Sequence, residues 1–434
     1  MNNWDFQKLH YKSGFNKIFL FVKNQFWFFL SFAVSKGLVF LTPLLFAEIL
    51  SIESFGVLEY ALSGLGFVLN TLLNLGVPGS YPYFILKKKK INIRNGFSIH
   101  PLWLLLVFIV NTILYLFEAV DEQIFLAMNI AFVISNQIFY SIQLKSHEKS
   151  ALAVVMDSGV YLVLFVSYII FKLKLVAISI PAINCIIFIY GVYYAFLGIK
   201  NFSRAVKKNI LEHYKLILRY SKNLLIASFL IFLITSSGRI VVEWFFGYDK
   251  VGIYGFYYRL AAIVVMIHQI INITYFKKIY TVKPQILDNY FAGFFAFIYG
   301  FSIVFYYSSP IVMNPLSTFF RETYLDNSAV FFILSSQMVV WIASALNSNI
   351  IDRENLMKPN NIRFMALVVV FMSIFFLFKA SMTFELVAYT LYSSIFIACI
   401  LQYYSLYKKD IFFYKSAVVL FISFTITSLM FFSR

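Results

Sequence analysis

The chain has 434 residues, of which 61% are hydrophobic and only 13% are charged, and its formal net charge is +17. Soluble domains are about half apolar and a quarter charged, so this composition excludes an ordinary soluble protein and indicates a polytopic membrane protein. The basic residues fall mainly in alternate loops, a pattern that sets membrane orientation and argues against a nucleic-acid partner. The two cysteines, Cys185 and Cys399, lie in apolar segments and predict neither a disulfide framework nor a zinc site.

Thirteen apolar segments are long enough to cross a bilayer, which takes about 20 residues. Six of them form a first half of the chain, at residues 26–49, 55–77, 99–117, 124–144, 151–171 and 175–199. Six more form a second half, at residues 224–246, 251–274, 290–307, 328–350, 362–378 and 383–404. The last segment, residues 411–432, stands outside this division.

The segments predict five parts: an interfacial cytoplasmic N-terminus at residues 1–25, a six-helix lobe at 26–199, a basic cytoplasmic linker at 200–223, a second six-helix lobe at 224–406, and an extra C-terminal helix at 407–434. The N-terminal part is basic and aromatic without a small-residue cleavage site, so we expect it to be retained. The basic loops predict that it lies in the cytoplasm. An odd number of spans then places the C-terminus outside.

Two short acidic turns, at residues 51–57 and 247–253, indicate an internal repeat. One constant shift aligns Glu53 with Asp249 and Gly56 with Gly252. Because each half has an even number of spans, both halves enter the membrane in the same direction, as parallel repeats related by an axis along the membrane normal. The predicted fold is therefore an all-α polytopic membrane protein with two six-helix lobes around a central cavity, plus one C-terminal helix.

Three basic residues fall inside predicted spans, where a charge is costly unless it is paired or faces a cavity. Lys36 lies near the middle of the first span, and Arg239 and Arg259 lie at similar depth on two consecutive spans, where we expect them to share a cationic site. Two alternatives are open. Arg239 can pair with Glu243 one helical turn on, and Arg259 can extend to the outer interface.

The second span carries a polar stripe of Ser63, Asn70 and Asn74, which either lines a cavity or hydrogen-bonds to neighbouring helices. Glu59, on the same span, is predicted to pair with a cation or to bind a coupling ion, H⁺ or Na⁺. Asp157, near the end of the fifth span, is expected to be partly hydrated and is a second candidate for charge pairing or ion coupling.

Catalytic motifs are missing from the sequence, which contains no nucleotide-binding P-loop, no H-E-x-x-H and no G-x-S-x-G. We therefore expect no enzymatic activity, no ATP hydrolysis and no cofactor. Uphill transport would have to draw on an ion gradient, on substrate supply or on a reaction outside the chain.

Residues 41–57 and 73–78, together with residues 238–260, resemble the O-antigen and polysaccharide flippases of the multidrug/oligosaccharidyl-lipid/polysaccharide exporter superfamily. These flippases commonly have an acidic residue at the position of Gly238. The resemblance implies a multi-pass protein of the bacterial inner membrane that moves undecaprenyl-pyrophosphate-linked oligosaccharides to the outer leaflet for O-antigen, lipopolysaccharide or other surface polysaccharides. It also implies membrane lipids, a polysaccharide polymerase and a chain-length regulator as partners.

With this resemblance in view, we expect transport by alternating access, in which the two lobes rock about the central cavity. Lys36, Arg239 and Arg259 are then predicted to bind the pyrophosphate, since a basic side chain pairs strongly with phosphate in a dry site. A multidrug/cation antiporter of the same superfamily is the first alternative, but its cavity should present carboxylates. A polysaccharide polymerase or ligase is the second, and it usually needs a larger outer loop than this chain has.

Overall fold

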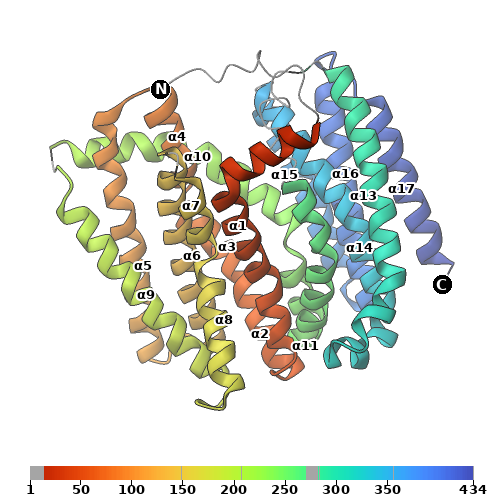
Figure 1. Cartoon of the computed structure of the whole chain (residues 1–434), viewed down its shortest axis with the longest axis horizontal. Helices are drawn as coiled ribbons and strands as arrows, with labels where there is room; N and C mark the ends of the chain where they lie inside the picture. The colour runs from red at the N-terminus through yellow and green to blue at the C-terminus, as the bar shows by residue number, and fades with distance from the viewer. Residues whose placement is uncertain are drawn as a thin grey trace.

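A computed structural model describes residues 14–433 except for residues 148, 207, 270–281, 283 and 355. All regular secondary structure in this part of the chain is helical (Figure 1). The first half contains α1 (Gly14–Ala47), α2 (Ile52–Ser63), α3 (Leu65–Leu73), α4 (Val77–Pro82), η2 (Tyr83–Lys87), η3 (Ile91–Ile99), α5 (His100–Leu116), α6 (Glu122–Ser146), α7 (Ser150–Asp157), α8 (Gly159–Lys172) and α9 (Ile180–Ser203). The second half contains α10 (Ile210–Thr235), α11 (Gly238–Ala261), η4 (Ala262–Val264), α13 (Pro284–Met313), α14 (Thr318–Arg353), α15 (Met357–Leu377), η5 (Lys379–Ser381), α16 (Phe384–Tyr407) and α17 (Tyr414–Phe432).

Twelve of the described helices are long and apolar enough to cross a bilayer, and the bent pair of α7 and α8 makes a thirteenth span. This confirms the predicted all-α polytopic membrane fold. Side chains that cap helix N-termini fix where several spans begin: the Asp121 carboxylate accepts from the Ile124 amide at 2.8 Å in α6, and the Thr383 hydroxyl accepts from the Leu386 amide at 3.3 Å in α16.

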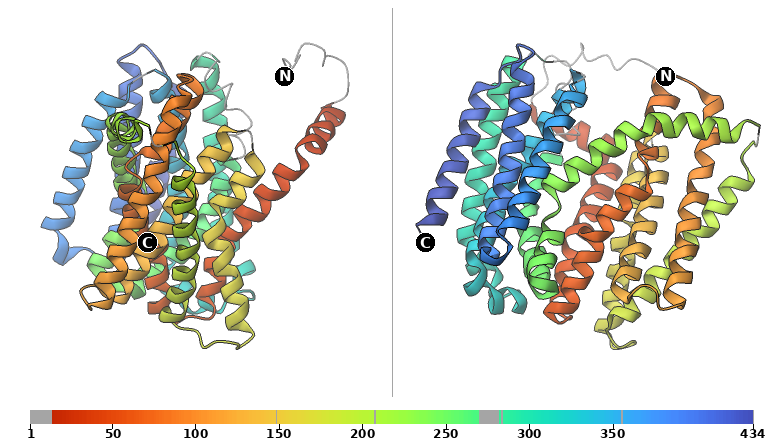
Figure 2. Two further views of the ribbon diagram at one scale, coloured as in Figure 1. Left: turned by 90° about the vertical axis from the view of Figure 1, so that its left-hand side faces the viewer. Right: turned by 180° about the vertical axis from the view of Figure 1, so that it is seen from behind.

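Helical order extends beyond several predicted spans. The first helix begins at Gly14, so it runs through much of the predicted interfacial segment, of which residues 1–13 lie outside the described residues. Helix α10 begins at Ile210, within the predicted linker, and Figure 2 shows its first turns lying across the end of the bundle before it slopes inward. Helix α14 begins at Thr318, within the predicted outer loop, and bends at Asn327.

Three spans expected to be continuous are broken. The second span breaks at Gly64, between α2 and α3, and the fifth bends by 54° at Ser158, between α7 and α8. The seventh breaks between α10 and α11, where the Ser237 hydroxyl donates to the Leu233 carbonyl at 2.6 Å. Breaks leave backbone groups without helical partners, and nearby hydroxyls re-satisfy them inside a membrane.

Helix α11 contains a sharp turn at Gly247, whose φ of +75° is the left-handed conformation that glycine adopts without strain. The residues before this turn complete the seventh span, and those after it begin the eighth. Together with the turn between α1 and α2, it lies at one end of the bundle, which we call the hairpin end and define by residues 48–57 and 247–253. Figure 1 shows α2 and α11 side by side at this end, with α5–α9 on one side and α13–α17 on the other.

The two predicted repeats touch each other at the hairpin end. A Cβ atom added to Gly56 would collide with the Tyr248 carbonyl, and one added to Gly252 would lie 2.6 Å from the Ile52 carbonyl oxygen. Only glycine allows two helix backbones to approach this closely. Because α2 and α11 leave this contact in the same direction, the arrangement is the one expected of parallel repeats.

Candidate functional site

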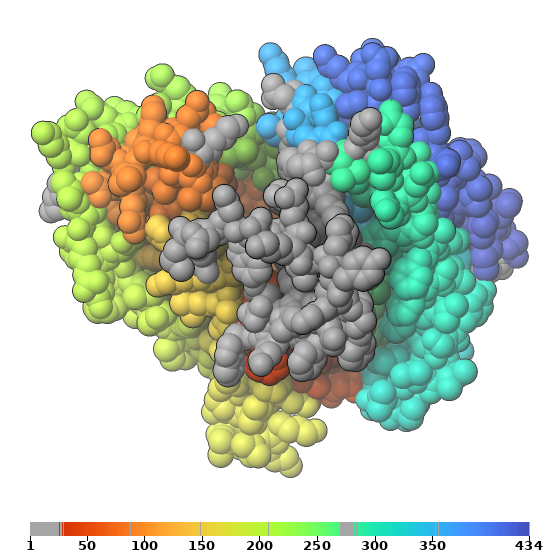
Figure 3. Space-filling view, turned by 45° about the horizontal axis from the view of Figure 1, so that its top comes forward, coloured from red at the N-terminus to blue at the C-terminus, as the bar shows by residue number. Residues whose placement is uncertain are grey.

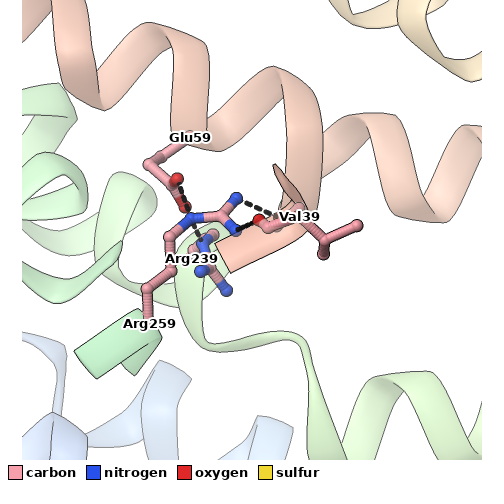
Figure 4. A network of polar contacts seen from close by, with 5 residues as sticks. Val39, Glu59, Arg239 and Arg259 are labelled. Atoms are coloured by element: carbon pink, nitrogen blue, oxygen red, sulfur yellow. Dashed lines mark hydrogen bonds and ion pairs between the residues drawn. The ribbon is translucent and has the colours of Figure 1, made fainter. Parts of the chain in front are cut away.

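The buried centre of the molecule holds an ion cluster of one carboxylate and two guanidinium groups (Figure 4). The Arg239 Nε atom lies 2.9 Å from Glu59 Oε2, and the Arg259 Nε atom donates to Glu59 Oε1. Glu59 is 0% exposed, and each arginine is 5% exposed. Glu59 comes from α2 in the first half and both arginines from α11, so the cluster ties the two halves of the chain together with a net charge of +1.

Further contacts hold the Arg259 guanidinium in place. Its Nη1 donates to the Val39 carbonyl of α1 at 3.1 Å, and its Nη2 donates to the Ser63 hydroxyl at 3.3 Å. The centre of the Tyr161 ring, on α8, lies 6.0 Å from the Arg259 Cζ atom. Arg259 therefore contacts three helices of the first half besides its pair with Glu59.

Two glycines make room for this cluster. A Cβ atom at Gly255 would lie 2.7 Å from Glu59 Cγ, so the carboxylate fits only because α11 has no side chain there. At the break between α2 and α3, a Cβ atom at Gly64 would lie 3.2 Å from Arg239 Cβ. The close packing of α2 on α11 thus shapes the pocket that encloses the three charges.

The cluster resolves the alternatives left by the sequence. Arg239 and Arg259 lie together, as expected from their similar depth, and they do so by pairing with the same carboxylate, that of Glu59. The pair of Arg239 with Glu243 is not formed, because the Glu243 carboxylate lies against the Tyr60 hydroxyl instead. The alternative in which Arg259 extends to the outer interface does not hold either, since its side chain is buried.

Lys36 lines a cavity of about 650 Å³ between α1, α6 and α7. Its ammonium group lies 5.8 Å from the Phe32 ring centre and makes no ion pair with any described residue. On the opposite wall, Lys145 Nζ lies 2.7 Å from Asp157 Oδ2. Asp157 is partly exposed, which agrees with the predicted partial hydration, and its partner Lys145 lies just beyond the predicted span at residues 124–144.

The Lys36 cavity adjoins the ion cluster through α1. Val39 lines the cavity one helical turn after Lys36, and its carbonyl is the group that Arg259 binds. A ligand in the cavity would therefore lie one helix wall away from a buried guanidinium.

A second cavity, of about 480 Å³, lies between the two halves and is lined by α3, α4, α6, α10 and α14. Asn70 and Asn74 line it, together with Phe67, Leu224 and Trp341. Asn70 Oδ1 also accepts from the Ser135 hydroxyl of α6 at 3.0 Å, so this residue both faces a cavity and bonds between helices. Ser63, the third residue of the predicted polar stripe, does not line this cavity, and its hydroxyl accepts from Arg259 in the ion cluster.

The hairpin end is closed by contacts that the sequence did not reveal. Glu48, in the turn after α1, accepts from the Thr318 amide at 2.9 Å and from the Ser317 hydroxyl, at the first turn of α14. The rings of Phe55 and Phe319 pack edge to face, with their centres 5.6 Å apart. These contacts join the first half to the second on the far side of the ion cluster from Lys36.

No group of three His, Cys, Asp or Glu side chains among the described residues could hold a metal ion. Residues 21–276, more than half of the chain, match the profile of the polysaccharide biosynthesis protein family. No curated protein and no solved structure shows significant similarity. By its sequence profile and its polytopic helical fold, the chain belongs to the polysaccharide biosynthesis protein family.

Proposed function

We propose that the protein is a flippase that moves undecaprenyl-pyrophosphate-linked oligosaccharides from the cytoplasmic to the outer leaflet of a bacterial inner membrane. Membership of the polysaccharide biosynthesis family supports a lipid-linked saccharide as the substrate. The observation that carries the proposal is the Lys36 cavity, where two lysines, Lys36 and Lys145, face one carboxylate, Asp157, which pairs with Lys145. The cavity adjoins a cluster with net charge +1.

The charges of this region favour an anionic substrate over a cationic drug. Two of the three carboxylates that the sequence suggested for ion coupling or charge pairing are engaged by basic groups, Glu59 by two arginines and Asp157 by Lys145, whereas the third, Glu243, lies against the Tyr60 hydroxyl. Lys36 remains available to a pyrophosphate, whose charge-assisted hydrogen bonds are strong in a site shielded from water. Coupling to H⁺ or Na⁺ is a separate prediction, which centres on these carboxylates.

The closed hairpin end supports alternating access. In this scheme the headgroup enters from the opposite end and binds at Lys36, while the polyprenyl tail stays in the bilayer. A pyrophosphate in the Lys36 cavity lies on the other side of α1 from the Arg259 guanidinium, and its negative charge, acting across this wall, weakens the hold of Glu59 on Arg259. Loosening that ion pair weakens the joint between the two halves and favours opening of the hairpin end. Substrate binding and opening are thereby linked through one side chain.

Substitutions at Lys36 test the proposal. We expect Lys36→Gln to lower the rate of flipping of a lipid-linked oligosaccharide in proteoliposomes by roughly 10- to 100-fold, the worth of one charge-assisted hydrogen bond. Lys36→Arg keeps the charge and should retain much of the activity. Lys88→Gln removes a loop charge and is the matched control. Equal activity of Lys36→Gln and the control, with both proteins folded, would overturn the assignment.

A test on the arginines needs a balanced design. Replacing Arg239 and Arg259 by Gln leaves the Glu59 carboxylate buried and unpaired, which destabilises the fold whatever the substrate. The informative variant therefore also carries Glu59→Gln. This triple variant should insert and fold but lose flipping, and a deletion strain carrying it should accumulate lipid-linked repeat units on the cytoplasmic leaflet. Normal surface polysaccharide would contradict a role for the arginines.

A further inference from the structure

A third pocket lies at the end of the first half opposite to the hairpin end and shares no residue with the two cavities described above. Its volume is about 250 Å³, and it is lined by the side chains of Tyr81, Arg94, Asn95, Phe97, Ser98, Gln143, Asn201, Arg204 and Ala205. These residues come from α4, η3, the last turns of α6, and the last turns of α9 and the turn that follows it. In Figure 3, which brings this end forward, the orange surface around η3 adjoins the yellow-green surface around the end of α9.

The charge of this pocket is unbalanced. Arg94 and Arg204 both line it, whereas no Asp or Glu does. Neither arginine forms an ion pair with any residue that the structure describes. Two guanidinium groups that share a pocket repel each other, and an anion between them removes this cost.

The remaining polar groups of the pocket are uncharged amides and hydroxyls, which can donate hydrogen bonds to an anion. Asn95, Gln143 and Asn201 contribute amides, and the Tyr81 hydroxyl lies within hydrogen-bonding contact of Arg94. Tyr81 and Ser98 are buried, so the pocket has a fixed floor. Arg94 and Arg204 are themselves exposed, as are the lysines at residues 88–90, but the two arginines line this pocket and the lysines do not.

The dimensions and position of the pocket select the kind of anion. A volume of 250 Å³ is below the roughly 300–1,000 Å³ of pockets for drug-sized ligands, so it accommodates a phosphate group with a few attached atoms and excludes an oligosaccharide repeat unit. It lies at the ends of spans, beside the basic loops, where the headgroups of anionic lipids gather. Guanidinium groups bind phosphate oxygens in bidentate fashion.

We propose that this pocket binds the phosphate group of an anionic membrane lipid, with Arg94 and Arg204 as its two clamps. The bound headgroup joins η3 to the turn between α9 and α10. Helix α10 packs on η3 at the same place, where a Cβ atom at Gly96 would lie 2.8 Å from His213 Cβ. The site therefore fixes the start of the connection between the two halves. It does not depend on the proposed flippase activity, and its test measures lipid binding alone.

Native mass spectrometry of the full chain, purified in detergent and titrated with phosphatidylglycerol, tests the proposal. We expect one lipid to bind more tightly than the rest, and Arg94→Gln with Arg204→Gln to weaken that binding by at least about 10-fold. The matched control, Lys88→Gln with Lys89→Gln, removes the same charge from the same end and should leave it unchanged. Arg204→Lys, which keeps the charge and is expected to fold, should weaken binding because the bidentate contact is lost.

The other arms of the experiment separate the sources of phosphate. Phosphatidylcholine should not fill the site, and inorganic phosphate should compete only weakly. Equal losses in the arginine and lysine double variants would mean diffuse attraction of headgroups and would overturn the proposal. Tight binding of inorganic phosphate that excludes the lipid would overturn the lipid assignment.

Discussion

Replacing Glu59 by Gln should open the hairpin end of the molecule. The substitution keeps the shape of the side chain but removes the negative charge that two buried guanidinium groups share. Gln still offers one carbonyl oxygen, so at most one of Arg239 and Arg259 keeps an acceptor at this position. The closed arrangement then contains two buried positive charges in contact and no anion.

The size of the effect follows from the burial of the cluster. Removing one partner of a buried ion pair costs about 3–5 kcal/mol, because the other charge is left without compensation. When the two halves separate, the arginines become hydrated and this cost disappears. The equilibrium between closed and open hairpin ends should therefore move toward the open form by roughly 100- to 5,000-fold. Exposed pairs are worth much less, about 0–1 kcal/mol, and would not produce such a shift.

Distance measurements between spin labels at Ser54 and Asp249, one on each side of the hairpin end, would report the opening. The labels require replacement of Cys185 and Cys399. We expect a narrow, short distance distribution in the parent protein and a longer, broader one in Glu59→Gln. Glu53→Gln is the matched control, because Glu53 lies on the same helix but is exposed and forms no ion pair with a described residue.

A second substitution decides whether charge is the cause. Glu59→Gln combined with Arg239→Gln restores the net charge of +1, and Arg259 keeps its contacts with Val39 and Ser63. This double variant should return most of the population to the closed form. If Glu59→Gln alone gives the distance distribution of the parent, the cluster does not hold the halves together and the reasoning fails.

Two further predictions concern contacts elsewhere in the fold. Gly252→Ala should lower the unfolding temperature in detergent, since the added methyl group would lie 2.6 Å from the Ile52 carbonyl and such overpacking costs about 1–3 kcal/mol. Asp288→Ala should loosen α17, because the Asp288 carboxylate accepts hydrogen bonds from the backbone amides of Lys415 and Ser416, both at 2.9 Å. Losing a charged acceptor there costs about 1.5–3 kcal/mol. Trypsin should therefore cut the turn before α17 faster in this variant.

Each of these predictions has a matched control. Gly293→Ala places a methyl group in open space on α13, so it should leave the unfolding temperature unchanged or slightly raise it. Similar losses for Gly252→Ala and Gly293→Ala would contradict the close approach of α2 and α11. Asp410→Asn removes an exposed negative charge from the turn that trypsin cuts and keeps a side chain suited to the left-handed φ of +57° at this position. A cleavage rate equal to that of Asp288→Ala would show that Asp288 does not anchor α17.

Hydropathy and loop charge were sufficient to predict the helical class and the thirteen spans, because about 20 apolar residues must cover each crossing of a bilayer. They could not predict the breaks at Gly64, at Ser158 and before Ser237. A broken span keeps its apolar composition, and its interruption depends on which hydroxyls and neighbouring helices can satisfy the freed backbone groups. The bend at Ser158 illustrates this, since its hydroxyl donates to the Val155 carbonyl at 3.0 Å.

Equal depth predicted that Arg239 and Arg259 lie together, but the sequence could not identify their partner. The local rule for helices favours a residue three or four positions away, and for Arg239 that residue is Glu243. The actual partner, Glu59, is 180 positions earlier in the chain. Only the packing of α2 on α11 brings it close. In the same way, Lys145 meets Asp157 across two helices that the sequence treats as separate segments.

The ion cluster also explains why the two halves must differ in sequence where they touch. Arg259 and Ser63 are 196 positions apart, the same shift that aligns Gly252 with Gly56, and they contact each other directly. The position equivalent to Glu59 is Gly255, which lies against the Glu59 side chain. Identical halves would place acid against acid and arginine against arginine in a site without water, where like charges repel strongly. The glycines that allow close approach occur in both predicted repeats. Each charged residue of the contact, by comparison, has a small residue at the equivalent position of the other half, Gly255 for Glu59 and Ser63 for Arg259.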